Sequence, residues 1–229
     1  MSISEQLNLQ FEFRPAYGDN DFLVTSSNRD AVSWIDCWPN WTASCLIIYG
    51  PSGCGKTHLS EVFRNRSNAQ SITHRELADN IIRDPEESFG AWIFEDADSY
   101  LNLHSPIPLF HLFNQVHEGG GSLLMSACSA PARWSISLND LRSRFNASQS
   151  VSIFSPDDEL LAAVLLKHFS DRQLRVSADV VIYTVKRIER SFRAISKLVE
   201  RLDHLSLSTR REITIPFVRQ VLMQKKTNV

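Results

Sequence analysis

The stretch Gly50-Pro51-Ser52-Gly53-Cys54-Gly55-Lys56-Thr57 reads G-x-x-x-x-G-K-[ST], the pattern of a phosphate-binding loop. It follows the apolar run Leu46–Tyr49 and precedes a helical pattern over 58–66, which gives the strand–loop–helix setting that the motif requires. Glycines let backbone N–H groups surround phosphates at a helix N-terminus. Lys56 can reach the β- and γ-phosphates, and the Thr57 hydroxyl can ligate Mg²⁺. Together with the following His58, the loop predicts a site for a nucleoside di- or triphosphate.

Length and composition set the class of protein. The chain has 229 residues, of which 43% are hydrophobic, so it can bury a substantial core. The longest apolar stretches, such as Leu160–Leu166, are too short to span a bilayer, and the acidic start Met1–Phe13 is no signal peptide. The four cysteines form no C-x-x-C pair. We therefore expect a cytoplasmic protein with no membrane partner.

Charge is distributed unevenly along the chain. The net charge of −2 argues against a protein whose main task is to coat nucleic acid. Residues 1–150 hold 10 Lys/Arg and 17 Asp/Glu, whereas residues 151–229 hold 14 and 9. The basic C-terminal part can contact phosphates or an acidic partner, and solvated helix faces explain it about as well.

Hydrophobic periodicity predicts an α/β core followed by a helical bundle. Strand-like runs at 46–49, 91–94, 122–127 and 151–154 alternate with helical patterns at 58–66, 74–83 and 106–118, which is typical of a parallel sheet covered by helices.

The strand-like runs stop at about residue 155. Ser155 resembles an N-cap with Pro156 at the first helical position of a helix that runs to about Ser170. Ser177 and Ser191 are similar caps, and a last short helix begins near Pro216. An apolar stripe marks the helix after Ser191: Ile195, Leu198, Val199, Leu202 and Leu205.

A second nucleotide signature is the apolar strand Trp92-Ile93-Phe94, which ends in Glu95 and Asp96. At a strand's C-terminal edge, one carboxylate can support Mg²⁺ and another can orient water toward the γ-phosphate. A solvated strand end gives the same pattern. Because most such sites read Asp first, the assignment of the metal and water roles to Glu95 and Asp96 stays open.

Three further polar residues are candidates for the site. Ser126 ends a strand and can sense the γ-phosphate, although a satisfied strand-end serine is equally consistent. Arg144, in Leu141-Arg142-Ser143-Arg144-Phe145, can neutralise charge in a transition state, often in a neighbouring subunit, and the alternative is a surface arginine. Arg193 follows the cap Ser191, where a cation opposes the helix dipole unless a bound phosphate compensates.

These features in this order resemble the AAA+ ATPases, and more narrowly the DnaA/Hda-type family. The resemblance covers nearly the whole chain. Asp21-Phe22-Leu23-Val24, with Ser27-Asn28-Arg29 and Ala31, is similar to the adenine-side segment, which implies that Phe22 and Val24 contact the base. Leu141–Phe145 resembles box VII, which implies that Arg144 is the arginine finger, and Arg193 matches the sensor 2 arginine. Glu212–Val218 resembles the closing segment of Hda.

The N-terminal segment carries a second part of the resemblance. Gln6-Leu7-Asn8-Leu9-Gln10-Phe11 looks like the motif by which Hda docks on the β sliding clamp of DNA polymerase III. Leu7, Leu9 and Phe11 can anchor an extended peptide, with Gln6 supplying hydrogen bonds. The alternation of apolar and polar residues equally fits a half-buried strand. Gln10 departs from the proline common in Hda, whereas Trp34-Ile35-Asp36 and Trp38-Pro39 look like alphaproteobacterial Hda-type proteins.

The resemblance implies three parts: a clamp-binding segment at 1–20, an AAA+ core at 21–154 and a helical lid at 155–229. It implies bound ADP or ATP with Mg²⁺, and the partners DnaA, the clamp and, through the clamp, DNA. The expected function is to promote hydrolysis of DnaA-bound ATP, with Arg144 acting in trans and weak intrinsic hydrolysis. Two alternatives remain: an autonomous ATPase or helicase loader that forms a homo-oligomer, and a clamp- or membrane-tethered adaptor whose nucleotide is structural.

Overall fold

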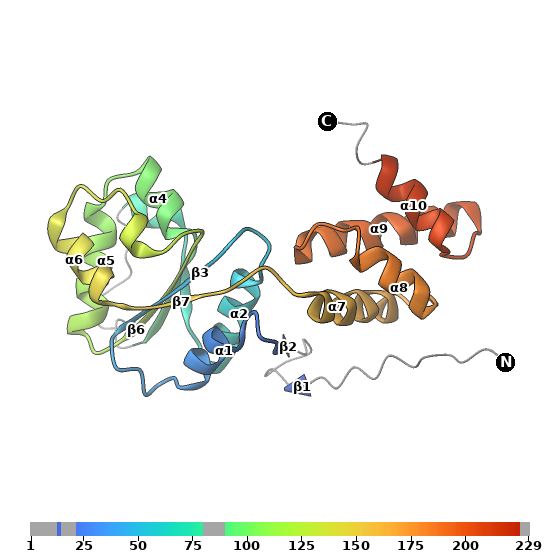
Figure 1. Cartoon of the computed structure of the whole chain (residues 1–229). Coiled ribbons are helices and arrows are strands. Elements are labelled where there is room, and N and C mark those ends of the chain that lie inside the picture. The colour runs from blue at the N-terminus through green and yellow to red at the C-terminus, as the bar shows by residue number, and fades with distance from the viewer. Residues whose placement is uncertain (1–12, 15–21, 80–89, 225–229) are drawn as a thin grey trace. The chain divides into compact units, whose positions relative to one another are not determined.

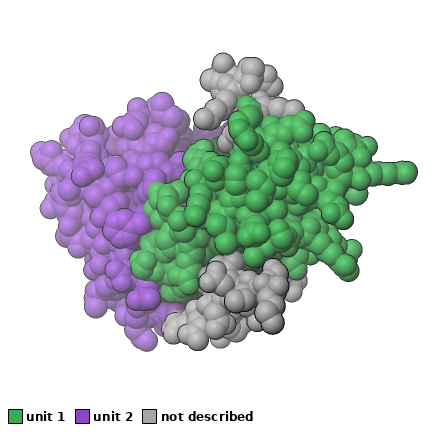
Figure 2. Space-filling view, turned by 45° about the vertical axis from the view of Figure 1, so that its right-hand side comes forward, with its two compact units in different colours: residues 1–14, 23–27, 155–229 green, residues 15–22, 28–154 purple. Residues whose placement is uncertain are grey.

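A computed structural model describes residues 13–14, 22–79 and 90–224 of the chain (Figure 1). The described residues form two compact units, which Figure 2 colours separately. One unit is built mainly by residues 28–154, and the other by residues 155–224 together with Leu23–Ser27. Two short strands, β1 (Phe13–Arg14) and β2 (Phe22–Leu23), pair with each other. The segment Leu23–Ser27 thus belongs with the C-terminal helices, although it precedes the phosphate loop in sequence.

The first unit is organised around a five-stranded sheet with the order β4-β5-β6-β3-β7. All neighbouring strands are parallel, so the predicted parallel α/β core is confirmed. Tyr49 at the end of β3 lies opposite Ala127 of β6 and Ser152 of β7, which aligns the carboxyl ends of three strands. The strands are β3 (Cys45–Tyr49), β4 (Gln70–Ile72), β5 (Ala91–Phe94), β6 (Ser122–Ala127) and β7 (Gln149–Ser152).

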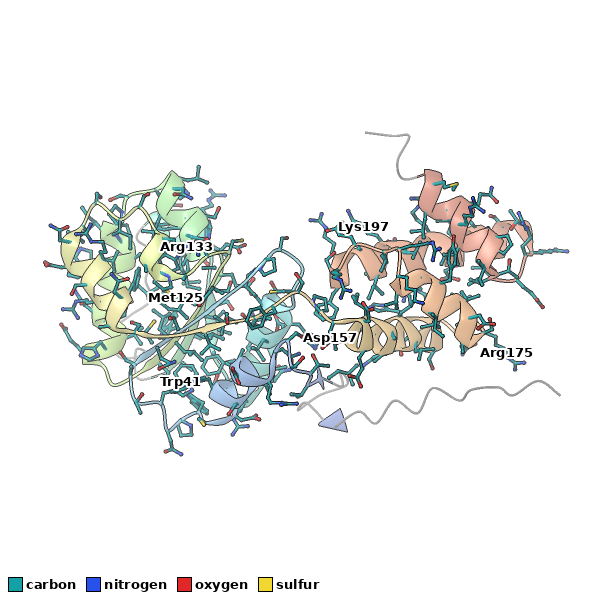
Figure 3. The ribbon with its side chains drawn as sticks, viewed as in Figure 1. Trp41, Met125, Arg133, Asp157, Arg175 and Lys197 are labelled. Carbon is teal, nitrogen blue, oxygen red and sulfur yellow. The ribbon has the colours of Figure 1, made fainter. Side chains whose placement is uncertain are left out.

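Helices cover both faces of this sheet. Figure 1 shows α4, α5 and α6 on one side and α1 and α2 on the other. Cys45 and Ile47 of β3 belong to the apolar cluster under the first group, and the alternation of a strand turns Leu46 and Ile48 to the other face. Met125 lies within the sheet (Figure 3). The helices are α1 (Arg29–Asp36), α2 (Lys56–Ser67), α3 (His74–Ala78), α4 (Ala97–Leu103), α5 (Ile107–Glu118) and α6 (Asn139–Ala147), with a 3-10 turn at Pro131–Arg133.

The structure differs from the predicted elements at several places. The strand β4 was not predicted, because it is three residues long and only Ile72 is buried. The helix predicted over 74–83 begins at His74, but α3 ends at Ala78, and residues 80–89 lie outside the described residues. The last strand was placed at 151–154, whereas β7 spans Gln149–Ser152. It lies at the sheet's edge, and of the apolar residues in the predicted run only Val151 pairs with β3, whereas Ile153 and Phe154 follow the strand and the polar residues Gln149 and Ser150 belong to it.

The second unit is a bundle of four helices with a separate apolar core. The predicted stripe on the third helix is confirmed, since Ile195, Leu198, Val199 and Leu202 are buried and Leu205 packs against them. None of the described helices is both long and apolar enough to cross a membrane. The four helices are α7 (Asp158–Asp171), α8 (Ala178–Val185), α9 (Phe192–Thr209) and α10 (Ile215–Gln224).

The caps of these helices correct one prediction. The first helix begins at Asp158, and its N-cap is Asp157, labelled in Figure 3, rather than Ser155. The Asp157 carboxylate accepts a hydrogen bond from the backbone N–H of Leu160 at 2.8 Å. Ser191 caps α9 as predicted, accepting from the N–H of Ala194 at 3.2 Å. Ser177 occupies the N-cap position of α8 without a side-chain capping bond.

Candidate functional site

The phosphate loop connects the end of β3 to the first residue of α2, Lys56. Gly53 and Gly55 have positive φ angles of 77° and 106°, which glycine adopts with little steric cost. Gly50 is required for a different reason: a Cβ there would collide with the carbonyl oxygen of Ile153. The N–H of Gly50 also donates to the carbonyl of Ala127 at 3.1 Å. The start of the loop is therefore fixed between the ends of β6 and β7.

The Lys56 ammonium is held inside the loop. Its Nζ donates to the carbonyl oxygens of Gly50 at 2.8 Å and Pro51 at 3.1 Å, and the residue is 7% exposed. Pro51 and Ser52 are exposed at the outer turn. Cys54 is buried beneath the loop, where burial raises the pKa of its thiol, partly offset by the positive charge of Lys56. Because the thiolate is the reactive form, Cys54 acts as a packing residue of the loop rather than as a nucleophile.

The acidic strand end lies beside the first turn of α2. The Thr57 hydroxyl donates to Oε2 of Glu95 at 3.4 Å, so two residues predicted as metal ligands are brought together. Glu95 is half-buried, and its Oε1 is buried without a hydrogen-bond partner among the described residues. Asp96 is exposed. An unpaired buried carboxylate oxygen next to a hydroxyl suits Mg²⁺, which prefers hard oxygen ligands.

These residues therefore fit a magnesium ion that is shared with phosphate oxygens. Within the described ranges, no three His, Cys, Asp or Glu side chains gather into a cluster that could hold a metal by themselves. Mg²⁺ is usually bound by one or two carboxylates together with substrate phosphates and water. The geometry of Thr57 and Glu95 matches that pattern.

Two side chains fix the turn that carries the acidic pair. Asp96 has the left-handed conformation, with φ 52° and ψ 47°. Its N–H donates to the Ser126 hydroxyl oxygen at 3.1 Å, and Nε2 of His74 lies 2.8 Å from the carbonyl oxygen of Glu95. Ser126 is only 2% exposed, and its hydroxyl contacts the N–H of Asp96 in this turn. Its role as a γ-phosphate sensor stays a prediction.

His74 and Asp98 form contacts near the acidic turn that the sequence did not reveal. Asp98 anchors α4 to the residues after β6, because its Oδ2 accepts from the N–H groups of Cys128 at 2.9 Å and Ser129 at 3.1 Å. His74 begins α3 behind a capping box formed by Thr73 and Glu76. The T-x-x-E pattern at 73–76 was a readable signal for that helix start, but the neighbouring strand β4 was too short to recognise.

Arg144 lies in the last turn of α6 and packs against α5. Its guanidinium carbon lies 5.5 Å from the ring centre of Phe110 and 5.7 Å from that of Phe113. The side chain is half-buried, whereas Arg142 is exposed and donates to Oδ1 of Asn139 at 2.8 Å. The described contacts of the Arg144 guanidinium are thus with aromatic rings rather than with the phosphate loop.

The remaining predicted residues lie in four different places. His58 is half-buried in the first turn of α2. In the helical unit, Arg193 is exposed in the first turn of α9, and Val24 is half-buried beside Leu23, which packs on Leu160 and Ala163. Phe22 lies in β2. The predicted clamp-binding residues Gln6, Leu7, Leu9 and Phe11 lie outside the described residues.

The comparison with family models gives one match in the helical unit. Residues 157–222 match the family described as "Hda, lid domain". The match covers most of the four-helix bundle, including Arg193 and its cap Ser191.

Comparisons over the whole chain agree with this fold. An uncharacterized protein of Haemophilus influenzae is 27% identical over 219 residues, which cover 90% of each chain. Domain III of the replication initiation protein DnaA from Thermotoga maritima superposes with a TM-score of 0.76 and 19% identity, covering 93% of this chain and 98% of that one. AMPPCP-bound DnaA from Aquifex aeolicus matches with a TM-score of 0.68 and 18% identity, covering 83% and 66%.

A more distant neighbour shares the same architecture. RuvB of Thermotoga maritima matches with a TM-score of 0.68 and 14% identity, covering 86% of this chain and 67% of that one. At these identities the structural likenesses establish an AAA+ fold. The resemblance to alphaproteobacterial Hda-type proteins in particular stays a prediction. The lid match at 157–222 and the shared fold agree with the resemblance to the DnaA/Hda-type AAA+ family.

Proposed function

We propose that this protein regulates the initiation of chromosomal replication: it binds adenine nucleotide and, with the DNA-loaded sliding clamp, promotes hydrolysis of DnaA-bound ATP. The observation that carries the proposal is an Hda-type lid at 157–222 in the same chain as a complete phosphate loop. DNA takes part indirectly, through the clamp, and the protein acts in the cytoplasm.

The nucleotide site consists of the loop and the acidic turn. Lys56 and the backbone of Gly50–Thr57 bind the phosphates of ADP or ATP, while Thr57 and Glu95 hold Mg²⁺. When bound, Mg²⁺ neutralises part of the phosphate charge. Asp96 is the exposed carboxylate that remains for orienting water. In the proposed complex, Phe22 and Val24 contact adenine, and Arg193 binds a phosphate.

Arg144 is the proposed catalytic group for the nucleotide of DnaA. Its guanidinium lies on the Phe110 and Phe113 rings, and such cation–π contacts limit the side chain's freedom before a partner arrives. An arginine supplied in trans stabilises transition-state charge in phosphoryl transfer, with rate factors on the order of 10³ or more. The position at the end of α6, rather than within the loop, supports action on a partner's nucleotide.

The decisive experiment measures ATP hydrolysis by DnaA in the presence of DNA-loaded clamp and this protein. We expect the parent protein to stimulate the rate and Arg144→Ala to lose at least about 10-fold of the stimulation. Arg142→Ala is the matched control, because Arg142 lies on the same helix and its contact is with Asn139. Stimulation by Arg144→Ala equal to that of the parent would exclude the arginine finger.

The clamp contact has its own test. Gln6→Ala should weaken binding to immobilised clamp and reduce the stimulation of DnaA, while nucleotide binding stays unchanged. A protein that functions as an adaptor with purely structural nucleotide would instead tolerate Lys56→Ala in the DnaA assay. Gln6→Ala and Lys56→Ala together distinguish a regulator that needs its nucleotide from an adaptor whose nucleotide is structural.

An autonomous ATPase is the second candidate function, and the contact between Thr57 and Glu95 favours it. A metal-binding pair at the strand end is also what an enzyme that hydrolyses its own ATP requires. Substantial ATP turnover without DnaA, abolished by Lys56→Ala, would support this candidate and a homo-oligomer in which Arg144 completes a neighbouring site.

A further inference from the structure

The peptide group between Glu95 and Asp96 is held by hydrogen bonds from two other strand ends. Its carbonyl oxygen, that of Glu95, lies 2.8 Å from Nε2 of His74, which follows β4. Its N–H, that of Asp96, donates to the Ser126 hydroxyl oxygen in β6. Because β5 lies between β4 and β6, the two bonds hold the turn from both neighbouring strands.

The turn needs this support. Asp96 has φ 52°, a left-handed conformation that costs free energy for any residue with a Cβ. The two hydrogen bonds orient the peptide plane that directly follows Glu95. Glu95 extends to within 3.4 Å of the Thr57 hydroxyl, so the support of the turn and the placement of the carboxylate are coupled.

His74 is itself rigidly placed. The capping box of Thr73 and Glu76 starts α3 at this residue. The ring packs at 5.3 Å from the Phe94 ring and, edge-on, at 5.3 Å from the Tyr100 ring. A carbonyl oxygen can only accept, so Nε2 must carry the proton in this contact.

We propose that His74 is a positioning residue that fixes the Glu95–Asp96 turn and thereby sets the affinity of the nucleotide complex for Mg²⁺. The inference rests on the proposed nucleotide binding. His74 acts through the main chain of Glu95, whose carboxylate would hold the metal. Groups that orient a metal-ligating side chain typically change metal affinity on the order of 10-fold when they are removed.

The experiment compares four proteins: the parent, His74→Ala, His74→Gln and His74→Asn. A fluorescent N-methylanthraniloyl ADP reports binding, first in EDTA and then during a Mg²⁺ titration. The amide nitrogen of Gln reaches about as far as Nε2 of histidine, whereas that of Asn stops near Nδ1. The Gln and Asn variants are thus a matched pair that differ in reach and share their chemistry.

We expect all four proteins to bind ADP equally in EDTA. The half-saturating Mg²⁺ concentration should rise about 10-fold in His74→Ala and His74→Asn, and His74→Gln should restore it to within about 3-fold of the parent. If the Ala variant unfolds, the difference in half-saturating Mg²⁺ concentration between His74→Gln and His74→Asn still tests the role of His74.

Two results would overturn the inference in distinguishable ways. A parent that responds to Mg²⁺, with His74→Asn and His74→Gln responding equally, would reject the role of His74 and leave the proposed function intact. If the His74 variants lose the same ADP affinity with and without Mg²⁺, His74 contributes to packing and does not set the affinity for Mg²⁺. A parent that binds no nucleotide would reject the proposed function together with the inference.

Discussion

Gly50 is the residue at which the fold and the phosphate site depend most directly on the absence of a side chain. A Cβ at this position would meet the carbonyl oxygen of Ile153 and approach Cys54 Sγ to 3.0 Å. A backbone oxygen cannot move aside without displacing the chain after β7. We expect Gly50→Ala to lower the free energy of unfolding by about 2 kcal/mol or more, measured by urea denaturation, and to weaken ADP binding.

Gly120→Ala is the control for this prediction. Gly120 has a φ of +68°, but nothing lies within 4 Å of an added Cβ. The substitution should therefore cost only the left-handed backbone strain, about 1 kcal/mol, and leave ADP binding unchanged. Equal losses of stability at Gly50 and Gly120 would contradict the steric explanation.

At the same scale, the sequence identified residues whose chemistry is local and missed those whose role depends on register. Lys56 and Thr57 follow from one continuous motif, and in the structure the Thr57 hydroxyl lies 3.4 Å from Oε2 of Glu95. The contact of His74 with Glu95 depends on β4 and β5 pairing in a particular register, with Ile72 opposite Phe94. That pairing is set by tertiary packing, which a single sequence does not encode as a local pattern.

Among the elements, α7 provides a test of helix capping at the start of the helical unit. The Asp157 carboxylate accepts from the N–H of Leu160 at 2.8 Å and from the Ser26 hydroxyl at 3.3 Å. Asp157→Ala should therefore lower the free energy of unfolding by about 1 kcal/mol, whereas Asp157→Asn should change it by only a few tenths. Ser155→Ala is the control, because the predicted cap lies outside the helix. If Ser155→Ala lowers the free energy of unfolding more than Asp157→Ala does, in thermal or urea denaturation, Ser155 is the N-cap, as the sequence predicted.

The same element shows why helix boundaries were harder to predict than helix existence. Ser155, Asp157 and Asp158 are all residues that favour an N-cap, and Pro156 fits the first helical position after Ser155. Three-dimensional contacts decided between them, since Leu160 packs with Leu23 and Ala163. The long apolar stripe of α9, by contrast, repeats over several turns and was predicted correctly.

For the whole molecule, the two units have separate apolar cores, so we expect two thermal transitions in the protein without nucleotide. ADP at about 100 times its Kd should stabilise the unit that contains the phosphate loop by about 2.7 kcal/mol, and Lys56→Ala should remove that shift.

If Arg193 binds a phosphate as proposed, the transition of the helical unit shifts as well. Arg193→Ala then loses the second shift and keeps the first. Lys197→Ala, an exposed cation one turn further along α9, should keep both. Calorimetry with and without ADP measures the two transition temperatures. If ADP does not change the transition temperature of the helical unit in the parent protein, Arg193 does not bind the nucleotide.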